Sequence, residues 1–525
     1  MDVPQKTRDA LRSFTVALPD LEDSASTRRW LAFVAGAFVT LQVSVCLLGQ
    51  YGYFIDELYY VACARHPAFG YVDHPPLAPL VLAVTRHVFG ESILGIRIVA
   101  FACGALVVWA SGRMATDLGG GRWAVLTTAV TSGLSPGVLG LTGFYSVNAF
   151  EAAIWVLCTW AVVRLLRSGD PRWWLAIGLA IGLGFESKHT ISTLAIALAG
   201  GVVLTSARRM LWSRWAMSGV IVALVLALPN SIWQAVNGFP SLEFYRQAAL
   251  LKNLPAPPAK VVIDQLRIMG LFTSPAWAAG LAFAWFHERR YRPLVIAYAI
   301  LLAMLVVSQQ SRPDRLLGIY PMLIAAGMVA FERWIRPTAL RAIVAAVLVV
   351  GCLPGIPIVI GVLPPPVLAR YMRAIGIDTA SERGRSSPIP QLLADRTGWE
   401  DFVAQVARIH ASLPPDEARH ALIYAPSYGQ AGAIDLLGSS YGLPRAIASQ
   451  NSYYHWSARE GVDSDVLIAV GANRADLESL FREVTEVGVT DCAYCMSWRN
   501  GMPIYLARGA VRPLSTMWSR VRHYE

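Results

Sequence analysis

The feature that most constrains this chain is a series of apolar runs, each close to the length of a membrane-spanning helix. Crossing a bilayer core takes about 20 apolar residues in helical conformation. Such runs occur at about residues 30–50, 93–112, 122–142, 144–166, 172–187, 188–206, 214–234, 267–286, 292–309, 315–333 and 341–362. We therefore expect an α-helical polytopic membrane protein with about 11 transmembrane helices.

The composition excludes a wholly soluble protein. Hydrophobic residues make up 55% of the 525 residues and charged residues only 15%, whereas ordinary soluble domains are about a quarter charged. The net charge of +10 does not indicate nucleic acid, because the arginines lie in short loops between apolar runs. That position is typical of topology determinants, so we expect membrane lipids and no nucleic acid among the partners.

Six groups of basic residues on alternate loops predict the orientation. They are Arg28 and Arg29; Arg113 and Arg122; Arg164, Arg167 and Arg172; Arg208, Arg209 and Arg214; Arg289, Arg290 and Arg292; and Arg333, Arg336 and Arg341. Short cytoplasmic loops are enriched in Lys and Arg, so a cytoplasmic N-terminus places all six groups inside. The loops 51–92, 235–266 and 310–314, and everything after about residue 363, are then expected outside.

The character of the chain changes at about residue 364, where three prolines end the last span. A helix-like segment (Trp399–Ser412), a strand-like segment (Ala421–Ala425) and a further helix-like segment (Asp476–Val487) follow. This alternation predicts a C-terminal extracytoplasmic α/β domain. The expected domains are a cytoplasmic tail (1–29), a transmembrane catalytic domain (30–363) with the outer loop 51–92, and the α/β domain (364–525).

The α/β segment also contains the only close cysteine pair of the sequence, Cys492-Ala493-Tyr494-Cys495. A disulfide or two free thiols is the simplest interpretation, and a redox role is the alternative.

The outer loop 51–92 carries an unusual set of acidic residues just past the first span. Asp56 and Glu57 are adjacent, and Asp73 follows in the same loop, ahead of a histidine and two prolines. The prolines exclude a helix interior there and fix the backbone. Ionisable residues of membrane segments tend to be functional, although Asp56 and Glu57 could instead cap the next helix.

Polar residues of other spans are expected at the same outer face. They are Arg97, Asn148, Glu151, Glu186, Lys188, His189, Asn230, Trp233, Gln234, Arg312, Asp314, Arg315 and Tyr320. Cations near the outer leaflet suit a phosphate carried by a lipid. Carboxylates suit a general base on a hydroxyl or amine, or a metal site built from Asp73, His74 and Asp56 or Glu57. Arg97 could instead extend to the headgroups.

The order of these motifs resembles the GT-C membrane glycosyltransferases, specifically the bacterial family 39 branch. That branch is related to protein O-mannosyltransferases and to the lipid A aminoarabinose transferase. The resemblance covers most of the chain, and the motifs behind it are residues 56–60, 70–77, 95–97, 184–190, 228–230, 233–234 and 320–321, with 428–433, 442–444, Asn451 and Trp456 in the outer domain.

The resemblance implies a GT-C fold and roles for individual residues. Asp56 resembles the proposed base on the acceptor, with Glu57 as its acidic catalytic partner that orients the loop or the acceptor. Asp73 resembles a second loop carboxylate that serves a metal or the phosphate site, and a divalent cation at Asp73 and His74 is the expected cofactor if one is used. The residues expected to bind the donor phosphate are Lys188, Arg97, His74, Tyr320 and Arg315. The residues expected to contact the acceptor or sugar are Tyr59, Asn148, Glu151, Glu186 and His189.

We therefore predict a hexosyl or pentosyl transferase of the bacterial cytoplasmic membrane. It moves a sugar from a polyprenyl-phosphate donor to a cell-envelope acceptor, which is a glycan, a glycolipid or a protein. The resemblance implies that transfer inverts the anomeric centre of the sugar. One alternative is a lipid-linked-sugar transporter or flippase, which should place ionisable residues near mid-bilayer in matching halves. The other is a non-catalytic member of the family.

Overall fold

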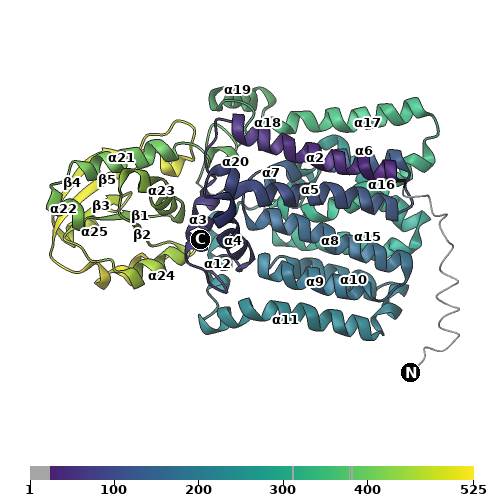
Figure 1. Cartoon of the computed structure of the whole chain (residues 1–525), viewed down its shortest axis with the longest axis horizontal. Coiled ribbons are helices and arrows are strands. Elements are labelled where there is room, and N and C mark those ends of the chain that lie inside the picture. Colours follow the sequence, from purple (N-terminus) through teal and green to yellow (C-terminus); the bar gives the residue numbers. More distant parts are fainter. Residues whose placement is uncertain (1–23, 310–311, 378, 380–381, 383) are drawn as a thin grey trace. The chain divides into compact units, whose positions relative to one another are not determined.

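The computed structural model describes residues 24–309, 312–377, 379, 382 and 384–525 (Figure 1). Two compact units divide the chain. Unit 1 contains residues up to Leu47 with 97–231 and 255–360, and unit 2 contains residues 48–96, 232–254 and 361–525. The predicted outer loop 51–92 therefore groups with the C-terminal domain rather than with the spans. Most of the predicted tail, residues 1–29, lies outside the described residues.

Unit 1 is helical and accounts for most of the expected membrane spans. The described residues contain seven helical segments long and apolar enough to cross a bilayer, or up to eight if a bent pair counts as one span. The seven are Ala25–Leu48 (α2), Ile93–Asp117 (α5), Val147–Ser168 (α8), Arg214–Val236 (α11), Arg289–Ser308 (with α15), Pro313–Trp334 (with α16) and Thr338–Val359 (with α17 and α18). Each corresponds to a predicted run, which confirms a multi-spanning membrane protein.

The remaining predicted runs are shorter or broken, so the count of eleven is not confirmed. The run 122–142 is two helices, α6 (Arg122–Leu134) and α7 (Pro136–Leu141), because Pro136 interrupts helix hydrogen bonding and holds Ser135 extended. The runs 172–187 and 188–206 are the short apolar helices α9 (Trp173–Ser187) and α10 (Ile191–Val203). The run 267–286 belongs to a pair, Pro258–Ile268 and Leu271–His287, bent by 91°.

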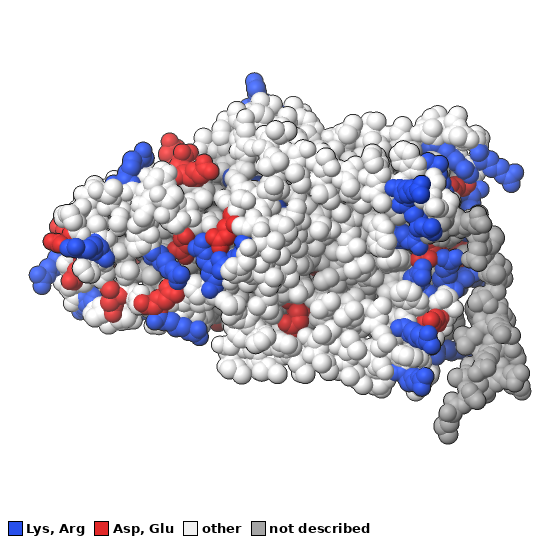
Figure 2. All heavy atoms as spheres, in the orientation of Figure 1, with Lys and Arg blue, Asp and Glu red and all other residues white. Residues whose placement is uncertain are grey.

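The basic loops of unit 1 meet at one end of its helices. Arg164 and Arg167 of α8 bind Asp117 at the end of α5, at 2.8 and 2.7 Å. At the starts of α6 and α2, the Arg122 guanidinium lies over the Trp30 ring. Figure 2 shows Lys and Arg gathered at this end of the unit. The alternation of basic loops is therefore visible in the fold, while the side of the membrane on which this end lies stays a prediction.

Unit 2 contains a five-stranded sheet, which confirms the predicted C-terminal α/β fold. Its strands are β1 (Leu422–Ala425), β2 (Ala446–Ala448), β3 (Val466–Val470), β4 (Phe481–Val489) and β5 (Pro503–Ala510), in the order β2-β1-β3-β5-β4. β1 pairs in parallel with β2 and β3, whereas β5 is antiparallel to β3 and β4. Figure 1 shows helices on both sides of the sheet, among them α21 (Trp399–Ala411), α23 (Tyr428–Leu437) and α24 (Asn451–Glu460).

Three sequence predictions for this domain have different outcomes. The helix at Trp399–Ser412 and the strand at Ala421–Ala425 are confirmed as α21 and β1. The helix at Asp476–Val487 is wrong, because only α25 (Arg474–Glu478) is helical before β4 begins at Phe481. The β-branched residues Val484, Thr485, Val487 and Val489 favour a strand, and β4 is an edge strand whose exposed side chains hide the usual alternation.

The other helices of unit 2 come from all three of its segments. They are α3 (Ile55–Arg65), α4 (Leu77–Phe89), α12 (Pro240–Gln247), the π-helical turn η2 (Ala248–Lys252), α19 (Pro365–Ile375), α20 (Gln391–Ala394), α22 (Pro415–His420) and α26 (Trp518–Val521). Pro75 and Pro76 lie between α3 and α4, so the predicted exclusion of a helix interior at these prolines is confirmed.

Helices α3 and α23 pack closely because two glycines of α23 face α3. A Cβ atom on Gly432 would lie 2.8 Å from the carbonyl oxygen of Leu58, and one on Gly429 would lie 2.2 Å from Cγ1 of Ile55. Residues three apart share one helix face, so the two glycines form one smooth contact surface. This contact fixes the start of α3 against the sheet domain.

We expect Gly432→Ala to destabilise unit 2 by about 1–3 kcal/mol, because the added methyl group overlaps the backbone of α3. The sign is diagnostic, since alanine in place of glycine inside a helix otherwise stabilises by about 0.5–1 kcal/mol. Thermal unfolding and limited proteolysis in detergent measure the effect. Gly36→Ala is the matched control, because a Cβ atom there meets nothing within 4 Å. Equal stability of the two variants would contradict the packing argument.

Candidate active site

The first acidic pair lies at the start of α3, and its two carboxylates face different surroundings. Glu57 is fully buried, and its Oε2 accepts the backbone N–H of Phe54 at 2.8 Å. A carboxylate at the third helical position that binds the N-cap N–H is a helix-capping arrangement. Glu57 therefore fixes the first turn of α3 and so the position of Asp56. This is a positioning role, and the capping alternative is correct for Glu57.

Asp56, one residue earlier, is partly exposed and is bound by the C-terminal domain. The hydroxyl of Tyr428 donates to its Oδ1 at 3.0 Å. Burial raises the pKa of Asp56 above the ordinary carboxyl value, and the nearby charges of Asp73 and Glu382 add to that rise. The Lys252 ammonium group and the Tyr428 hydrogen bond lower the pKa in part. A carboxyl group whose pKa is raised in this way binds a proton more readily than an ordinary aspartate, which suits a general base.

A second carboxylate is linked to the first through two stacked tyrosine rings. Tyr59, one turn along α3, donates to Oδ1 of Asp73 at 2.9 Å. Its ring stacks on that of Tyr428 with centroids 4.6 Å apart, and its hydroxyl accepts the backbone N–H of Ser452 at 3.2 Å. Tyr59 is 1% exposed, so it supports the arrangement from inside and does not offer a surface to a sugar.

Sequence reasoning missed the groups that surround Asp56 from distant segments. Lys252 of η2 forms an ion pair with Glu382 at 3.4 Å, and Glu382 also binds Arg385 at 2.8 Å. Tyr428 appeared only as part of a motif. A usable signal existed for Lys252, which is one of very few lysines in a chain whose basic residues are almost all arginine. Its neighbours in the sequence are uncharged, so nothing local indicated a partner.

Asp73 and His74 do not fit the expected metal site. Nδ1 of His74 lies 3.0 Å from the carbonyl oxygen of Pro75, Nε2 lies 3.8 Å from Sγ of Cys63, and the ring is 3% exposed. Among the described residues, no group of three or more His, Cys, Asp or Glu side chains could hold a metal ion. The buried ring of His74 is equally unsuited to a phosphate contact. The use of a divalent cation stays a prediction.

A second polar cluster lies in unit 1, around Lys188 at the end of α9. Its Nζ donates to Oε2 of Glu151 at 2.6 Å and to Oδ1 of Asn148 at 2.7 Å. Thr190 donates to the other carboxylate oxygen of Glu151. The Lys188 side chain keeps 20% of its exposure against 9% for Glu151. The structure thus brings together three predicted site residues, with Glu151 as the charge partner of the lysine.

The same region contains the predicted residues Glu186 and His189. The backbone N–H of Asn230 donates to Oε1 of Glu186 at 3.1 Å, and its side-chain Oδ1 lies 2.8 Å from Nε2 of His189. Pro229 precedes Asn230 inside α11 and disrupts the regular helix hydrogen bonds there. Glu186 and His189 are therefore joined through one turn of α11.

The remaining predicted phosphate ligands of unit 1 have mixed outcomes. Lys188, Arg312 and Arg315 all lie within electrostatic range of Asp314, so Arg315 belongs to the neighbourhood of the lysine. Tyr320 is fully buried, and its hydroxyl donates to Oε1 of Gln265 at 3.0 Å.

Arg97 does not extend to the surface, since it is 3% exposed and its Nη1 lies 3.9 Å from Sγ of Cys46. The acidic residues of the predicted outer loop, Asp56, Glu57 and Asp73, thus belong to unit 2, whereas the predicted phosphate ligands Lys188, Arg97 and Arg315 belong to unit 1.

Comparison with known proteins finds related membrane glycosyltransferases. Residues 73–233 match the family described as dolichyl-phosphate-mannose-protein mannosyltransferase. The undecaprenyl phosphate-alpha-4-amino-4-deoxy-L-arabinose arabinosyl transferase of Pseudomonas aeruginosa is 24% identical over 277 residues, 49% of each chain. The polyprenol-phosphate-mannose–protein mannosyltransferase of Corynebacterium glutamicum is 29% identical over 173 residues, 28% of this chain and 32% of that protein. The chain matches about half or less of the length of these relatives.

Among solved structures, ArnT from Cupriavidus metallidurans bound to undecaprenyl phosphate has a TM-score of 0.57 at 15% identity, over 92% of this chain and 98% of that one. Its apo state has a TM-score of 0.53 at 16% identity, over 90% and 98%. This likeness confirms the predicted GT-C fold. In sequence the chain is similar to an arabinosyl transferase and a mannosyltransferase that are named for lipid-linked donors, and its fold is that of the GT-C glycosyltransferases, which agrees with the resemblance that its motifs predict.

Proposed function

We propose that the protein is a glycosyltransferase that moves a hexose or pentose from a polyprenyl-phosphate carrier to a cell-envelope acceptor. The observation that supports this most directly is Asp56, a partly exposed carboxyl group at a fixed helix start, bound by Tyr428 and with a pKa raised by burial. The relatives are named for sugars carried on undecaprenyl or polyprenol phosphate, and one solved relative holds undecaprenyl phosphate. These names support the class of donor.

In the proposed reaction Asp56 takes the proton of the acceptor hydroxyl or amine as that group attacks the anomeric carbon. The bond between that carbon and the phosphate oxygen breaks, and the polyprenyl phosphate leaves as a stabilised anion. Such a leaving group needs no general acid, so one base is enough, unlike the carboxylate pair of glycoside hydrolysis. Attack from the face opposite the phosphate inverts the anomeric centre.

We assign the donor phosphate to the cations of unit 1, with Lys188 as its main ligand and Arg315 beside it. Lys188 is already neutralised by Glu151 at 2.6 Å, so a bound phosphate would share or replace that carboxylate. Exchange of one anionic partner for another costs less than binding a phosphate to a lysine taken from water, because the ammonium group is already desolvated. Asn148, Glu186 and His189 then border the space for the sugar.

We also propose the orientation that the basic loops favour. The arginine-rich end of unit 1 (Figure 2) would face the cytoplasm of a bacterial cell, and the N-terminus would lie there too. From the same alternation of loops in the sequence, we propose that residues 51–92, with Asp56, and the residues after 363 act outside the cytoplasmic membrane.

We expect Asp56→Asn to lower sugar transfer at least about 100-fold, which is the typical contribution of a general base, without loss of protein from the membrane. Transfer of labelled sugar from a polyprenyl-phosphate donor in membranes expressing each variant measures this. Asp401→Asn, an exposed aspartate of α21, is the matched control and should retain full activity. An active Asp56→Asn variant would rule out Asp56 as the base.

The pH dependence of transfer should report on Lys252. The base must be ionised, so kcat/KM falls as pH drops through the pKa of Asp56. Lys252 stabilises the ionised form, so Lys252→Met raises that pKa further and moves the acid limb of the pH–rate profile to higher pH. Tyr428→Phe acts in the same direction, because its hydrogen bond also favours the carboxylate. Lys260→Met, a lysine paired with Asp264 in α13, is the control, and identical profiles for all variants would contradict the assignment.

Chelation tests the expected divalent cation. Because Asp73 and His74 do not fit a metal centre, we expect EDTA to change transfer by the purified protein less than about twofold. Asp73→Asn should then weaken transfer equally with and without EDTA, since it replaces the charged acceptor of the Tyr59 hydroxyl by a neutral one and removes no metal ligand. Loss of activity in EDTA with recovery on adding Mg²⁺ or Mn²⁺ would instead show an essential cation.

A further inference from the structure

The cysteine pair of the sheet domain lies in a turn that brings its two sulfur atoms together. The turn runs through Ala493 and Tyr494 after β4. The buried thiol of Cys495 contacts both the sulfur of Cys492 and its carbonyl oxygen, the latter at 3.2 Å. Cys492 is partly exposed, whereas Cys495 is 3% exposed. In a redox-active pair the accessible thiol attacks the partner and the shielded thiol resolves the mixed disulfide. Cys492 fits the first role and Cys495 the second.

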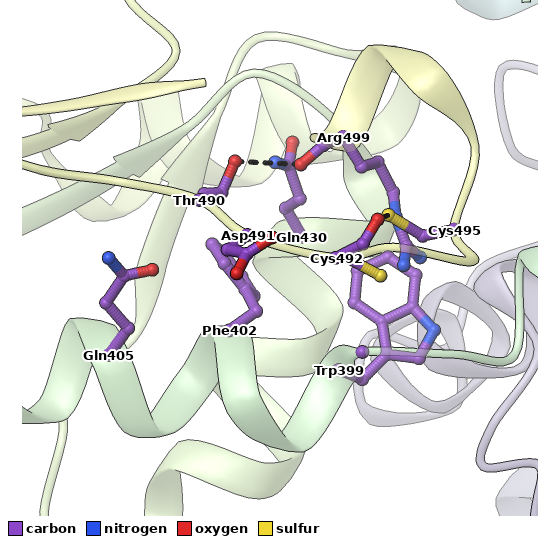
Figure 3. Close-up of a pocket in the computed structure, with 10 residues that line it drawn as sticks. Trp399, Phe402, Gln405, Gln430, Thr490, Asp491, Cys492, Cys495 and Arg499 are labelled. Carbon is purple, nitrogen blue, oxygen red and sulfur yellow. Dashed lines mark hydrogen bonds between the residues drawn. The ribbon is translucent and has the colours of Figure 1, made fainter. Parts of the chain in front are cut away.

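The cationic side chain of Arg499 lies near Cys492 and Cys495. The guanidinium group of Arg499 lies 3.7 Å from the centre of the Trp399 ring and donates to the carbonyl oxygen of Thr397. Figure 3 shows both cysteines and Arg499 gathered around the ring of Trp399. The Cys495 thiol and the Arg499 charge lower the pKa of Cys492 to about 6, while the hydrogen bond with Cys492 and burial raise the pKa of Cys495. A positive neighbour and a thiol donor are the usual causes of thiolate formation in proteins.

The backbone leaves room for this sulfur. Gly398 has φ +75°, and a Cβ atom on it would lie 2.5 Å from Sγ of Cys492. The pair also borders a small pocket that is lined in part by Phe402, Gln430 and Asp491 (Figure 3). Because Cys492 is partly exposed, a partner thiol or disulfide can reach its sulfur from solvent.

We propose that Cys492 and Cys495 form a redox-active dithiol that reacts by thiol–disulfide exchange with a disulfide compound that reaches Cys492 from solvent. The Cys492 thiolate attacks one sulfur of the partner, whose S–S bond breaks to give a mixed disulfide and one thiolate. Cys495, deprotonated, attacks Sγ of Cys492 and displaces the second thiolate. The two cysteines lose two electrons and two protons, and the partner becomes two thiols.

This proposal is distinct from sugar transfer and uses none of its residues. The other interpretations are a permanent structural disulfide and two inert thiols. An inert thiol is typically buried in apolar surroundings, which describes Cys158 of the helical unit.

The full-length protein in detergent tests the proposal. It is equilibrated in buffers with different ratios of reduced to oxidised glutathione, its free thiols are alkylated, and the peptide containing residues 492–495 is analysed by mass spectrometry. We expect a reversible change between the dithiol and the disulfide within this series. A disulfide that stays closed in every buffer, or thiols that stay reduced in every buffer, would overturn the proposal without any variant.

Two serine variants assign the roles of the thiols. Cys495→Ser should trap a mixed disulfide of glutathione on Cys492, because the resolving thiol is gone. Cys492→Ser should trap little, because Cys495 is shielded, and iodoacetamide should label it about fivefold more slowly than it labels Cys492 in the first variant. The double variant, with the other five cysteines unchanged, is the control. Equal trapping on the two thiols would contradict the assigned roles.

Discussion

The contact between α3 and α23 is the interaction on which the proposed catalytic arrangement depends. Gly429 and Gly432 allow the two helices to approach within van der Waals distance of backbone. That approach places the Tyr428 hydroxyl on Asp56 and the Tyr428 ring on Tyr59. A bulkier α23 would separate the carboxylate from its hydrogen-bond donor even if every polar residue were kept. Packing therefore decides which groups surround Asp56.

The surroundings of Asp56 combine opposing effects in a way that suits a base. Desolvation and the neighbouring carboxylates favour the protonated form, whereas Lys252 and Tyr428 favour the ionised form. The ion pairs from Glu382 to Lys252 and Arg385 hold the lysine near without neutralising Asp56 directly. In unit 1, Glu151 neutralises Lys188 in a similar way. Both units thus contain a charged group whose partner is itself held by further hydrogen bonds.

Much of the fold could be predicted because membrane helices require long apolar segments, and such segments are easily identified in a sequence. Seven predicted runs are continuous helices, and the failures have local causes such as Pro136. The helix predicted at Asp476–Val487 failed because an exposed edge strand mixes polar and apolar residues without a clear period. The strand β4 forms by pairing with β5, and the residues of β4 alone do not reveal that pairing.

The site was predictable only in part for a related reason. Asp56 and Lys188 stand out because ionisable residues are rare next to apolar segments. Lys252, Tyr428 and Glu382, which change the pKa of Asp56, have no distinctive sequence context. Their effect on Asp56 depends on contacts between segments hundreds of residues apart, which the sequence does not show. For Glu57 two interpretations stood open, because a buried helix cap and a catalytic carboxylate cannot be told apart in the sequence, and its contact with the Phe54 N–H shows the cap.

The discontinuity of unit 2 has a consequence for biogenesis. Asp56 and Tyr428 are 372 residues apart in sequence, so α3 emerges from the ribosome long before its packing partner exists. Loop closure over such a separation is slow compared with local helix formation, and domains generally fold in the order of synthesis. The early segment around α3 must therefore wait, with its contact surface for α23 uncovered, until the sheet domain has been made. Assembly of the Asp56 environment is thus one of the last events in the maturation of the chain, and a partly synthesised chain lacks the Tyr428 hydrogen bond that belongs to the proposed base.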